Sequence, residues 1–180
     1  MDLNAIIREC LLGERTDTVV CFTTNGFVKS TGEAVMGRGC AKVVNDIFPD
    51  LALKLGWYLD NVGNRVHTLR PLGERNNHLL SFPTKHRCSS DDQLLPFYRR
   101  QIRPGVTIYP GWMGASDPKL IQCSAEQLRE TCRPEGPLHP QEIYLPAPGC
   151  SNGGLTWTNI EVMLDECFKD DNRYTIITEN

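Results

Sequence analysis

The sequence predicts one α/β domain in which helices cover both faces of a central sheet. The chain has 180 residues, enough for one domain with a sizeable core and short for two. Residues 18–23, TVVCFT, form a continuous β-branched and apolar run, which is typical of a strand buried on both faces. Helical and strand-like patterns then alternate along the chain, as they do in α/β folds.

Residues 1–59 predict three helices and one strand. Residues 2–12 have apolar positions at helical spacing, although a short strand is an alternative. The strand over 18–23 should end in a turn at Thr24, Asn25 and Gly26, followed by a loop or hairpin over 27–33. A glycine turn, MGRG, leads into a helix over 41–48 that Pro49 ends, and residues 50–59 predict another amphipathic helix.

Residues 60–180 predict four short strands and two helices. Strands are expected over 66–69, 79–82, 142–145 and 175–178, the second of them stopped by Pro83. Helices are expected over 118–132 and after the glycine-rich turn, where Thr156 or Thr158 can act as the N-cap. Residues 88–116 are interrupted by proline and glycine, which predicts an insertion or lid that includes a possible helix over 94–102.

The composition excludes some classes of protein. Hydrophobic residues make up 40% and charged residues 23%, and the net charge of −3 gives no long-range attraction to nucleic acid or anionic membranes. No apolar run approaches the roughly 18 residues of a transmembrane helix. The start, MDLNAIIREC, has charges within its apolar part and lacks the core of a signal peptide. We therefore expect a cytoplasmic protein with no membrane partner.

The cysteines predict neither a metal site nor a disulfide framework. None belongs to a C-x-x-C pair, so we expect no metal, and without a secretion signal most should be reduced and buried. Cys150 lies in the glycine turn, near a helix N-terminus that would favour a thiolate. Packing of a small residue is nevertheless the favoured interpretation for it. The eight are Cys10, Cys21, Cys40, Cys88, Cys123, Cys132, Cys150 and Cys167.

Four polar segments mark a candidate site: TTNG, MGRG, SFPTKHR and PAPGCSNGG. Ligands of α/β folds bind outside the carboxyl ends of the strands, where these segments fall. Two glycine turns at helix N-termini can bind two phosphates, yet the GxGxxG and GxxxxGK[ST] patterns are absent. Asn25 offers both a donor and an acceptor for ribose hydroxyls. Lys85, beside His86 and Arg87, can be a nucleophile, although the residues alone favour a solvated surface lysine.

Together these motifs resemble the macrodomain family. The stretches that carry the resemblance are CFTTNGF, AVMGRGCA, LLSFPTKHR and LPAPGCSNGGLTW, in that order. They are most similar to the branch with the DNA ADP-ribosylation antitoxins, the glutamate-ADP-ribose hydrolases and related small bacterial and phage proteins. The resemblance runs from about residue 19 to the end and is weakest over 88–116. It implies a single macrodomain over 1–180: a three-layer α/β/α sandwich with a mixed central sheet, binding ADP-ribose without a cofactor.

The resemblance also implies roles for individual residues. Asn25 matches the asparagine that contacts the distal ribose, and Lys85 matches the lysine that attacks, or supports attack at, the anomeric carbon. The implied reaction is hydrolysis of an ADP-ribosyl link to a nucleic-acid base or a protein side chain. Two loops match those that hold the diphosphate, namely Gly37, Arg38 and Gly39, and then Gly149, Cys150, Ser151, Asn152, Gly153 and Gly154.

Three departures from the family pattern affect these expectations. The aspartate that holds adenine in many macrodomains has its matching place at Glu9-Cys10, so Glu9 or Asp17 would have to substitute. Gly153 stands where the glutamate-ADP-ribose hydrolases have a catalytic aspartate. Thr156 makes the last motif GGLTW where antitoxin-type sequences often read GGLDW. Without a nearby carboxylate, His86 is the nearest candidate to carry a proton for Lys85.

Three functions are compatible with these features. The favoured one is an ADP-ribosyl hydrolase that uses Lys85. The alternative is a non-catalytic reader or sponge for ADP-ribose or a related NAD-derived metabolite. The third is an adaptor that binds a protein through Tyr109, Trp112 and Met113, residues that can equally form a lid or simply pack within their loop.

Overall fold

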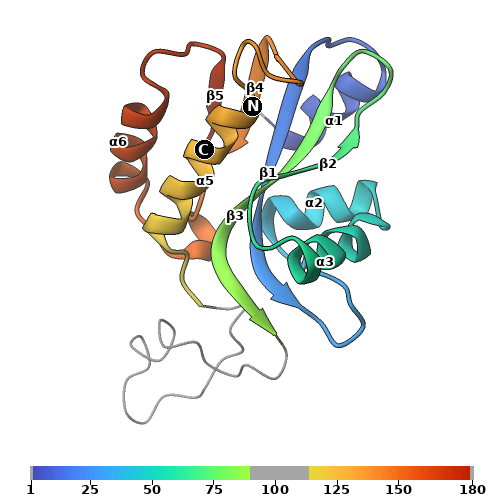
Figure 1. The fold of residues 1–180 in the computed structure, drawn as a ribbon, viewed down its shortest axis with the longest axis vertical. Helices are drawn as coiled ribbons and strands as arrows, with labels where there is room; N and C mark the ends of the chain where they lie inside the picture. Colours follow the sequence, from blue (N-terminus) through green and yellow to red (C-terminus); the bar gives the residue numbers. More distant parts are fainter. Residues whose placement is uncertain (1, 90–113, 179–180) are drawn as a thin grey trace.

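The protein is a three-layer α/β/α sandwich built on a mixed five-stranded sheet, as predicted (Figure 1). The computed structural model describes residues 2–89 and 114–178. The strand order is β2-β3-β1-β4-β5, in which β2 runs antiparallel to β3 and the other pairs are parallel. The strands are β1 (Thr18–Val28), β2 (His67–Pro71), β3 (His78–Ser89), β4 (Glu142–Pro146) and β5 (Tyr174–Ile177).

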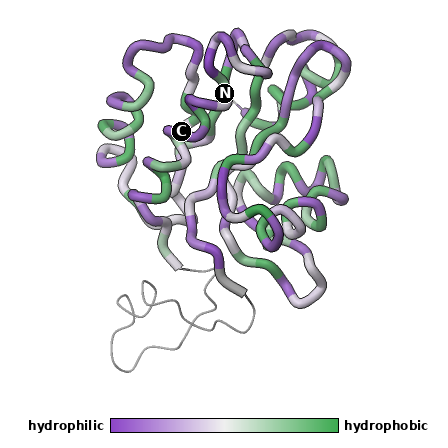
Figure 2. Tube along the Cα trace, in the orientation of Figure 1, coloured by the Kyte–Doolittle hydropathy of each residue, from purple (hydrophilic) through white to green (hydrophobic). Residues whose placement is uncertain are grey.

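Helices cover both faces of the sheet. One face carries α1 (Leu3–Leu11), α2 (Gly39–Ile47) and α3 (Leu51–Asn61), and the other carries α5 (Pro118–Thr131) and α6 (Trp157–Phe168). The central strand β1 serves both cores, because Val20 and Phe22 pack on the first face while Val19 and Cys21 pack on the second. Figure 2 shows hydrophobic and hydrophilic residues alternating along these helices, as expected for helices with one buried face.

Local signals define where two of the helices begin. Asp2 caps α1, because its carboxylate accepts a hydrogen bond from the backbone N–H of Asn4. Asp117 caps α5 in the same way, and Pro118 follows it at the first helical position. Residues 2–12, which were compatible with helix or strand, therefore form a helix, and the helices predicted over 41–48, 50–59 and 118–132 form as well. Thr156 is the N-cap residue of α6, but its side chain makes no capping hydrogen bond.

Two predicted strand ends are wrong. The first strand does not turn at Asn25; β1 continues to Val28, with an irregularity in its pairing to β3 between Thr24 and Gly26. The strand over 79–82 is not stopped by Pro83, since β3 runs on to residue 89. Proline is tolerated there because β2 pairs with β3 only as far as Ser81, which leaves that side of β3 without a strand partner among the described residues.

Most of the segment predicted as an insertion or lid, including the possible helix over 94–102 and the aromatic residues of the adaptor hypothesis, lies outside the described residues. The described end of this segment joins α5 directly, since Ser116 and Asp117 precede its first turn. In the described parts, 2–89 and 114–178, no helix is long and apolar enough to span a membrane.

Candidate functional site: a cleft at the strand ends

A cleft of about 1010 Å³ opens at the carboxyl ends of β1, β4 and β5, beside the second half of β3. It lies where the sheet order changes direction, because β1 has β3 on one side and β4 on the other. All four polar segments singled out in the sequence contribute to its lining, through Asn25, Gly37–Gly39, Lys85 and the loop from Gly149 to Gly153. The tertiary structure therefore brings together residues that are far apart in the chain.

Lys85 faces this cleft from a bulge in β3. Thr24 pairs with Pro83 and Gly26 pairs with Arg87, so a single residue of β1, Asn25, lies opposite three residues of β3. The bulge lets the consecutive residues Thr84 and Lys85 both line the cleft. Lys85 is 8% exposed, so it is not the solvated surface lysine that the residues alone favoured.

Burial shifts the protonation equilibrium of Lys85 toward the neutral amine. Burial lowers the pKa of Lys85 from the ordinary lysine value, because the charged form loses hydration. Its Nζ donates a hydrogen bond to the carbonyl oxygen of Asn152 at 3.4 Å, which points the side chain at the second glycine loop. An amine that is partly desolvated and directed into a cleft is suited to nucleophilic chemistry.

The first glycine loop presents the start of α2 to the cleft. Gly37, Arg38 and Gly39 line it together with Cys40 and Ala41 of the first turn. Within the described chain, no side chain caps this helix at Arg38. Gly39 has φ +57, a conformation that glycine adopts without strain. The first N–H groups and the positive end of the helix dipole are thus available for an anion.

The second glycine loop is a compact turn built around Ser116. Leu155 N–H donates to the carbonyl of Gly149 at 3.0 Å, and Ser116 N–H donates to the carbonyl of Gly153 at 2.9 Å. A Cβ on Gly153 would lie 2.4 Å from Ser116 Oγ. The side chain of Ser116 therefore occupies the space that a side chain at residue 153 would need, including the aspartate found in the glutamate-ADP-ribose hydrolases. The loop contains the short helix η2 (Ser151–Gly153).

Two other residues of this loop occupy defined places. Cys150 lines the cleft, but burial raises the pKa of its thiol, which opposes the thiolate that a helix N-terminus would favour. Asn152 lies close to the first loop, since its Nδ2 would be 3.4 Å from a Cβ placed on Gly39. The two glycine loops thus approach each other across the cleft.

Asn25 lines the cleft while it holds the backbone around the bulge. Its Oδ1 accepts a hydrogen bond from the N–H of Phe27, and its Nδ2 donates to the carbonyl of Val35, each at 3.0 Å. An amide group has two donor hydrogens and two acceptor lone pairs, so half of its capacity remains for a ligand.

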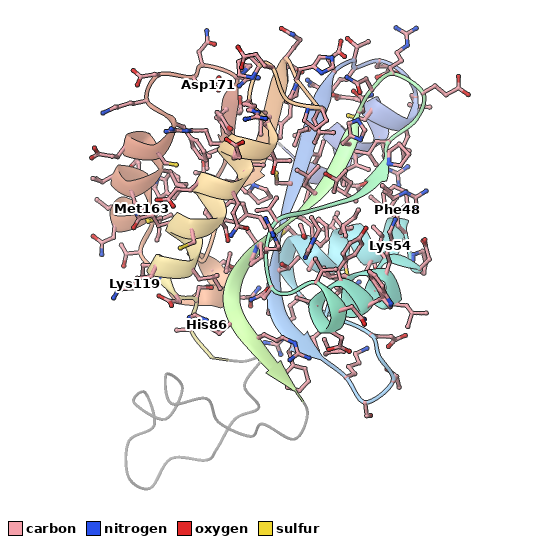
Figure 3. All side chains as sticks on the ribbon, viewed as in Figure 1. Phe48, Lys54, His86, Lys119, Met163 and Asp171 are labelled. Atoms are coloured by element: carbon pink, nitrogen blue, oxygen red, sulfur yellow. The ribbon has the colours of Figure 1, made fainter. Side chains whose placement is uncertain are left out.

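His86 lies outside the cleft lining. Its Nε2 is 2.5 Å from Oδ2 of Asp117, and Figure 3 places it on the side of β3 that faces the start of α5, near Lys119. Asp117 also caps α5 through Lys119 N–H. His86 thus contacts the cap of α5, and it is not among the described residues that line the cleft.

The cleft lining includes a carboxylate that sequence reasoning missed. Asp2 lines the cleft, together with Leu3, Trp157, Ile177 and Thr178. The two acidic residues proposed from the sequence do not line it: Glu9 pairs with Arg15 at 2.6 Å, and Asp17 bonds to Asn76 at 2.8 Å. The sequence signal that could have identified Asp2 is an aspartate immediately before a helical pattern at the start of the chain.

The architecture and the cleft define the class of this protein: the chain has the macrodomain fold. Among solved structures it is similar to the macrodomain of Mycobacterium tuberculosis DarG, with a TM-score of 0.59 and 21% identity over 93% of this chain and 91% of that one. It is also similar to the Thermus aquaticus DarG macrodomain, with a TM-score of 0.54 and 21% identity over 94% of this chain and 93% of that one.

A third neighbour is Thermosipho africanus DarTG, solved in complex with ADP-ribose. The TM-score is 0.61 and the identity 20%, over 94% of this chain but only 39% of that longer one. No family model matches the sequence. No curated protein matches it either.

Proposed function

We propose that the protein binds ADP-ribose and hydrolyses ADP-ribosyl links on nucleic acid or protein, with Lys85 as the reacting group. The observation that carries this proposal is the placement of a buried, cleft-facing lysine beside two glycine loops, one of them at an uncapped helix N-terminus. The binding of ADP-ribose to a neighbour of the same fold supports the choice of ligand.

The cleft offers a separate partner for each part of ADP-ribose. The diphosphate fits between the start of α2 and the second loop, where backbone N–H groups and Arg38 supply positive charge. The adenine fits against Asp2 and Trp157 of the cleft lining, because the carboxylate of Asp2 can accept from its amino group and Trp157 offers an aromatic ring. The distal ribose then lies near Asn25 and Lys85, which brings its anomeric carbon to the amine.

The chemistry assigned to Lys85 is nucleophilic. The neutral amine attacks the anomeric carbon, the bond from that carbon to the base or side chain breaks, and the leaving group takes up a proton. Water then releases ADP-ribose and regenerates the lysine. The lowered pKa of Lys85 supports this role, since a larger fraction of the amine is unprotonated than in an exposed lysine.

The test combines binding with turnover. Calorimetric titration with ADP-ribose, NAD and AMP measures recognition, and incubation with ADP-ribosylated DNA and ADP-ribosylated protein measures release of ADP-ribose. Lys85→Ala should abolish release while ADP-ribose binding stays nearly intact. Lys29→Ala is the matched control, because Lys29 is exposed and pairs with Glu33 away from the cleft. Failure of the wild-type protein to bind ADP-ribose would refute the proposal.

The alternative is a non-catalytic binder of ADP-ribose or a related NAD-derived metabolite. The observation that favours it is Gly153, whose contact with Ser116 leaves no space for an acidic side chain beside Lys85. A binder predicts a calorimetric signal with ADP-ribose and no release from either class of modified substrate. Release that depends on Lys85 would exclude it.

A further inference from the structure

The bulge that presents Lys85 interrupts regular strand pairing. Three residues of β3, Thr84, Lys85 and His86, lie opposite Asn25 alone. Beyond Ser81, β3 has no pairing to β2 among the described residues, so this stretch is also a sheet edge. Backbone polar groups in such a stretch need partners from outside the sheet.

Three consecutive carbonyls of this stretch find such partners. Ser124 Oγ donates to the carbonyl of Pro83 at 2.8 Å, and the N–H of Asp117 donates to that of Thr84 at 2.9 Å. The third, the carbonyl of Lys85 itself, accepts from Nδ2 of Asn64 at 2.8 Å. The first two donors belong to α5 and its cap, whereas Asn64 reaches Lys85 from the loop that joins α3 to β2.

The amide of Asn64 is oriented by this contact. Its Oδ1 is buried and has no hydrogen-bond partner within the described part of the chain. Rotating the amide would place that oxygen against the carbonyl of Lys85, where two acceptors would face each other. Leaving a buried acceptor unpaired costs roughly 1–3 kcal/mol. The side chain of Asn64 thus keeps the hydrogen bond from Nδ2 to the carbonyl of Lys85, while its Oδ1 stays unpaired among the described residues.

We infer that Asn64 is a positioning residue for Lys85, an inference that rests on the proposed hydrolase function. The side chain substitutes for the missing strand at the edge of β3 and holds the main chain of the bulge. The direction of Lys85 Nζ toward Asn152 and the cleft follows from that backbone position. Asn64 touches neither the cleft nor the amine, so it acts through Lys85 and takes no part in the chemistry.

The first experiment measures how well the amine of Lys85 is positioned to react with ADP-ribose. The lysine amine adds to the open-chain aldehyde of ADP-ribose with loss of water, and cyanoborohydride supplies hydride to reduce the imine to a stable amine. Mass spectrometry of the peptide that contains Lys85, at saturating ADP-ribose, then reports the rate of adduct formation on Lys85. Asn64→Ala and Asn64→Asp both remove the donor, and each should slow adduct formation by roughly 10- to 100-fold because the reacting atoms are misplaced. Dissociation constants for ADP-ribose should stay within about threefold of the wild-type value, which corresponds to less than about 1 kcal/mol of binding free energy.

Two matched variants separate positioning from general destabilisation. Asn61→Ala removes a neighbouring asparagine amide that donates to the carbonyl of Trp57, and it should leave adduct formation unchanged. Asn64→Gln keeps an amide donor and should recover part of the rate. Adduct formation at the wild-type rate in Asn64→Ala, or a loss no greater than the loss of binding, would overturn the inference.

A second readout does not depend on catalysis. Lys85 is acylated with a small amine-reactive reagent at a series of pH values, and peptide mass spectrometry measures the extent of reaction. The pH midpoint of this reaction should move toward the ordinary lysine value in Asn64→Ala, whereas the midpoint for Lys29 should not change. If the wild-type protein releases no ADP-ribose from any substrate, the hydrolase proposal fails, and this midpoint still decides whether Asn64 positions Lys85. An unchanged midpoint would overturn the inference on its own.

Discussion

The contact between Gly153 and Ser116 gives a prediction about stability that the structure quantifies. A Cβ on residue 153 would lie 2.4 Å from Ser116 Oγ and 3.1 Å from Ser116 Cβ, whereas ordinary contacts are 3.4–4 Å. Ser116 is 2% exposed and its amide is bonded to the same loop, so it has little room to move. Overpacking of this kind costs about 1–3 kcal/mol.

Gly153→Ala should therefore lower the free energy of unfolding by about 1–3 kcal/mol, or Tm by roughly 2–12 °C for a domain of this size. Gly153→Asp should cost at least as much and should not install a working carboxylate. Gly37→Ala is the control for stability, because a Cβ at Gly37 meets nothing within 4 Å. Thermal and urea unfolding, followed by circular dichroism, measure both.

A double-mutant cycle tests the cause. Ser116→Ala removes the oxygen nearest to the new Cβ, and it also removes a buried hydroxyl that has no partner among the described residues. Alone, it should be neutral or stabilising by up to about 1 kcal/mol. Combined with Gly153→Ala, it should recover roughly 0.5–2 kcal/mol of the loss. A Gly153→Ala protein as stable as the wild type, or strictly additive costs in the double variant, would refute the reasoning.

Three further predictions follow from the cleft and its bulge. Gly26→Ala should cost about 3 kcal/mol or more in urea unfolding, because a Cβ there would lie 2.4 Å from the backbone Cα of Arg87; an unchanged midpoint would contradict the close strand approach. Lys85→Met should raise Tm near neutral pH, since the lowered pKa of Lys85 means that its charge opposes folding. The difference in Tm between the variant and the wild type should shrink as pH rises from the folded pKa toward 10.5. A difference in Tm that does not change with pH would argue against a desolvated amine. Asp2→Asn should weaken ADP-ribose binding in calorimetry by roughly 10-fold, with ribose 5-phosphate as the control ligand; equal losses for both ligands would show that Asp2 does not face the adenine.

Much of the fold was predictable because its signals are local. The buried run at the start of β1, the capping and periodicity of α5 and the glycine turn before α2 depend on neighbours within a few residues. The four polar segments could be assigned to one site because the carboxyl ends of parallel strands converge. The macrodomain resemblance, read from the same segments, is consistent with the observed fold.

Errors arose where a local signal was overridden by contacts from elsewhere in the chain. Asn25-Gly26 has the composition of a turn, yet its amide bonds and its close approach to β3 keep it within β1. Pro83 reads as a strand terminator, yet it lies where β2 has already ended. Asp2 was overlooked as a cleft residue, because only packing brings it beside the end of β5.

The sequence by itself determined the class of fold and the positions of the two glycine loops, because residue type and spacing suffice for these, whereas Lys85 was singled out as reactive only through the macrodomain resemblance. Only the tertiary structure decided that Lys85 is buried, that a bulge directs it into the cleft, and that Gly153 accommodates Ser116. The physical reason is separation along the chain. Lys85 meets Asn152 across 67 residues and Asn64 across 21, and such contacts exist only once the sheet has assembled.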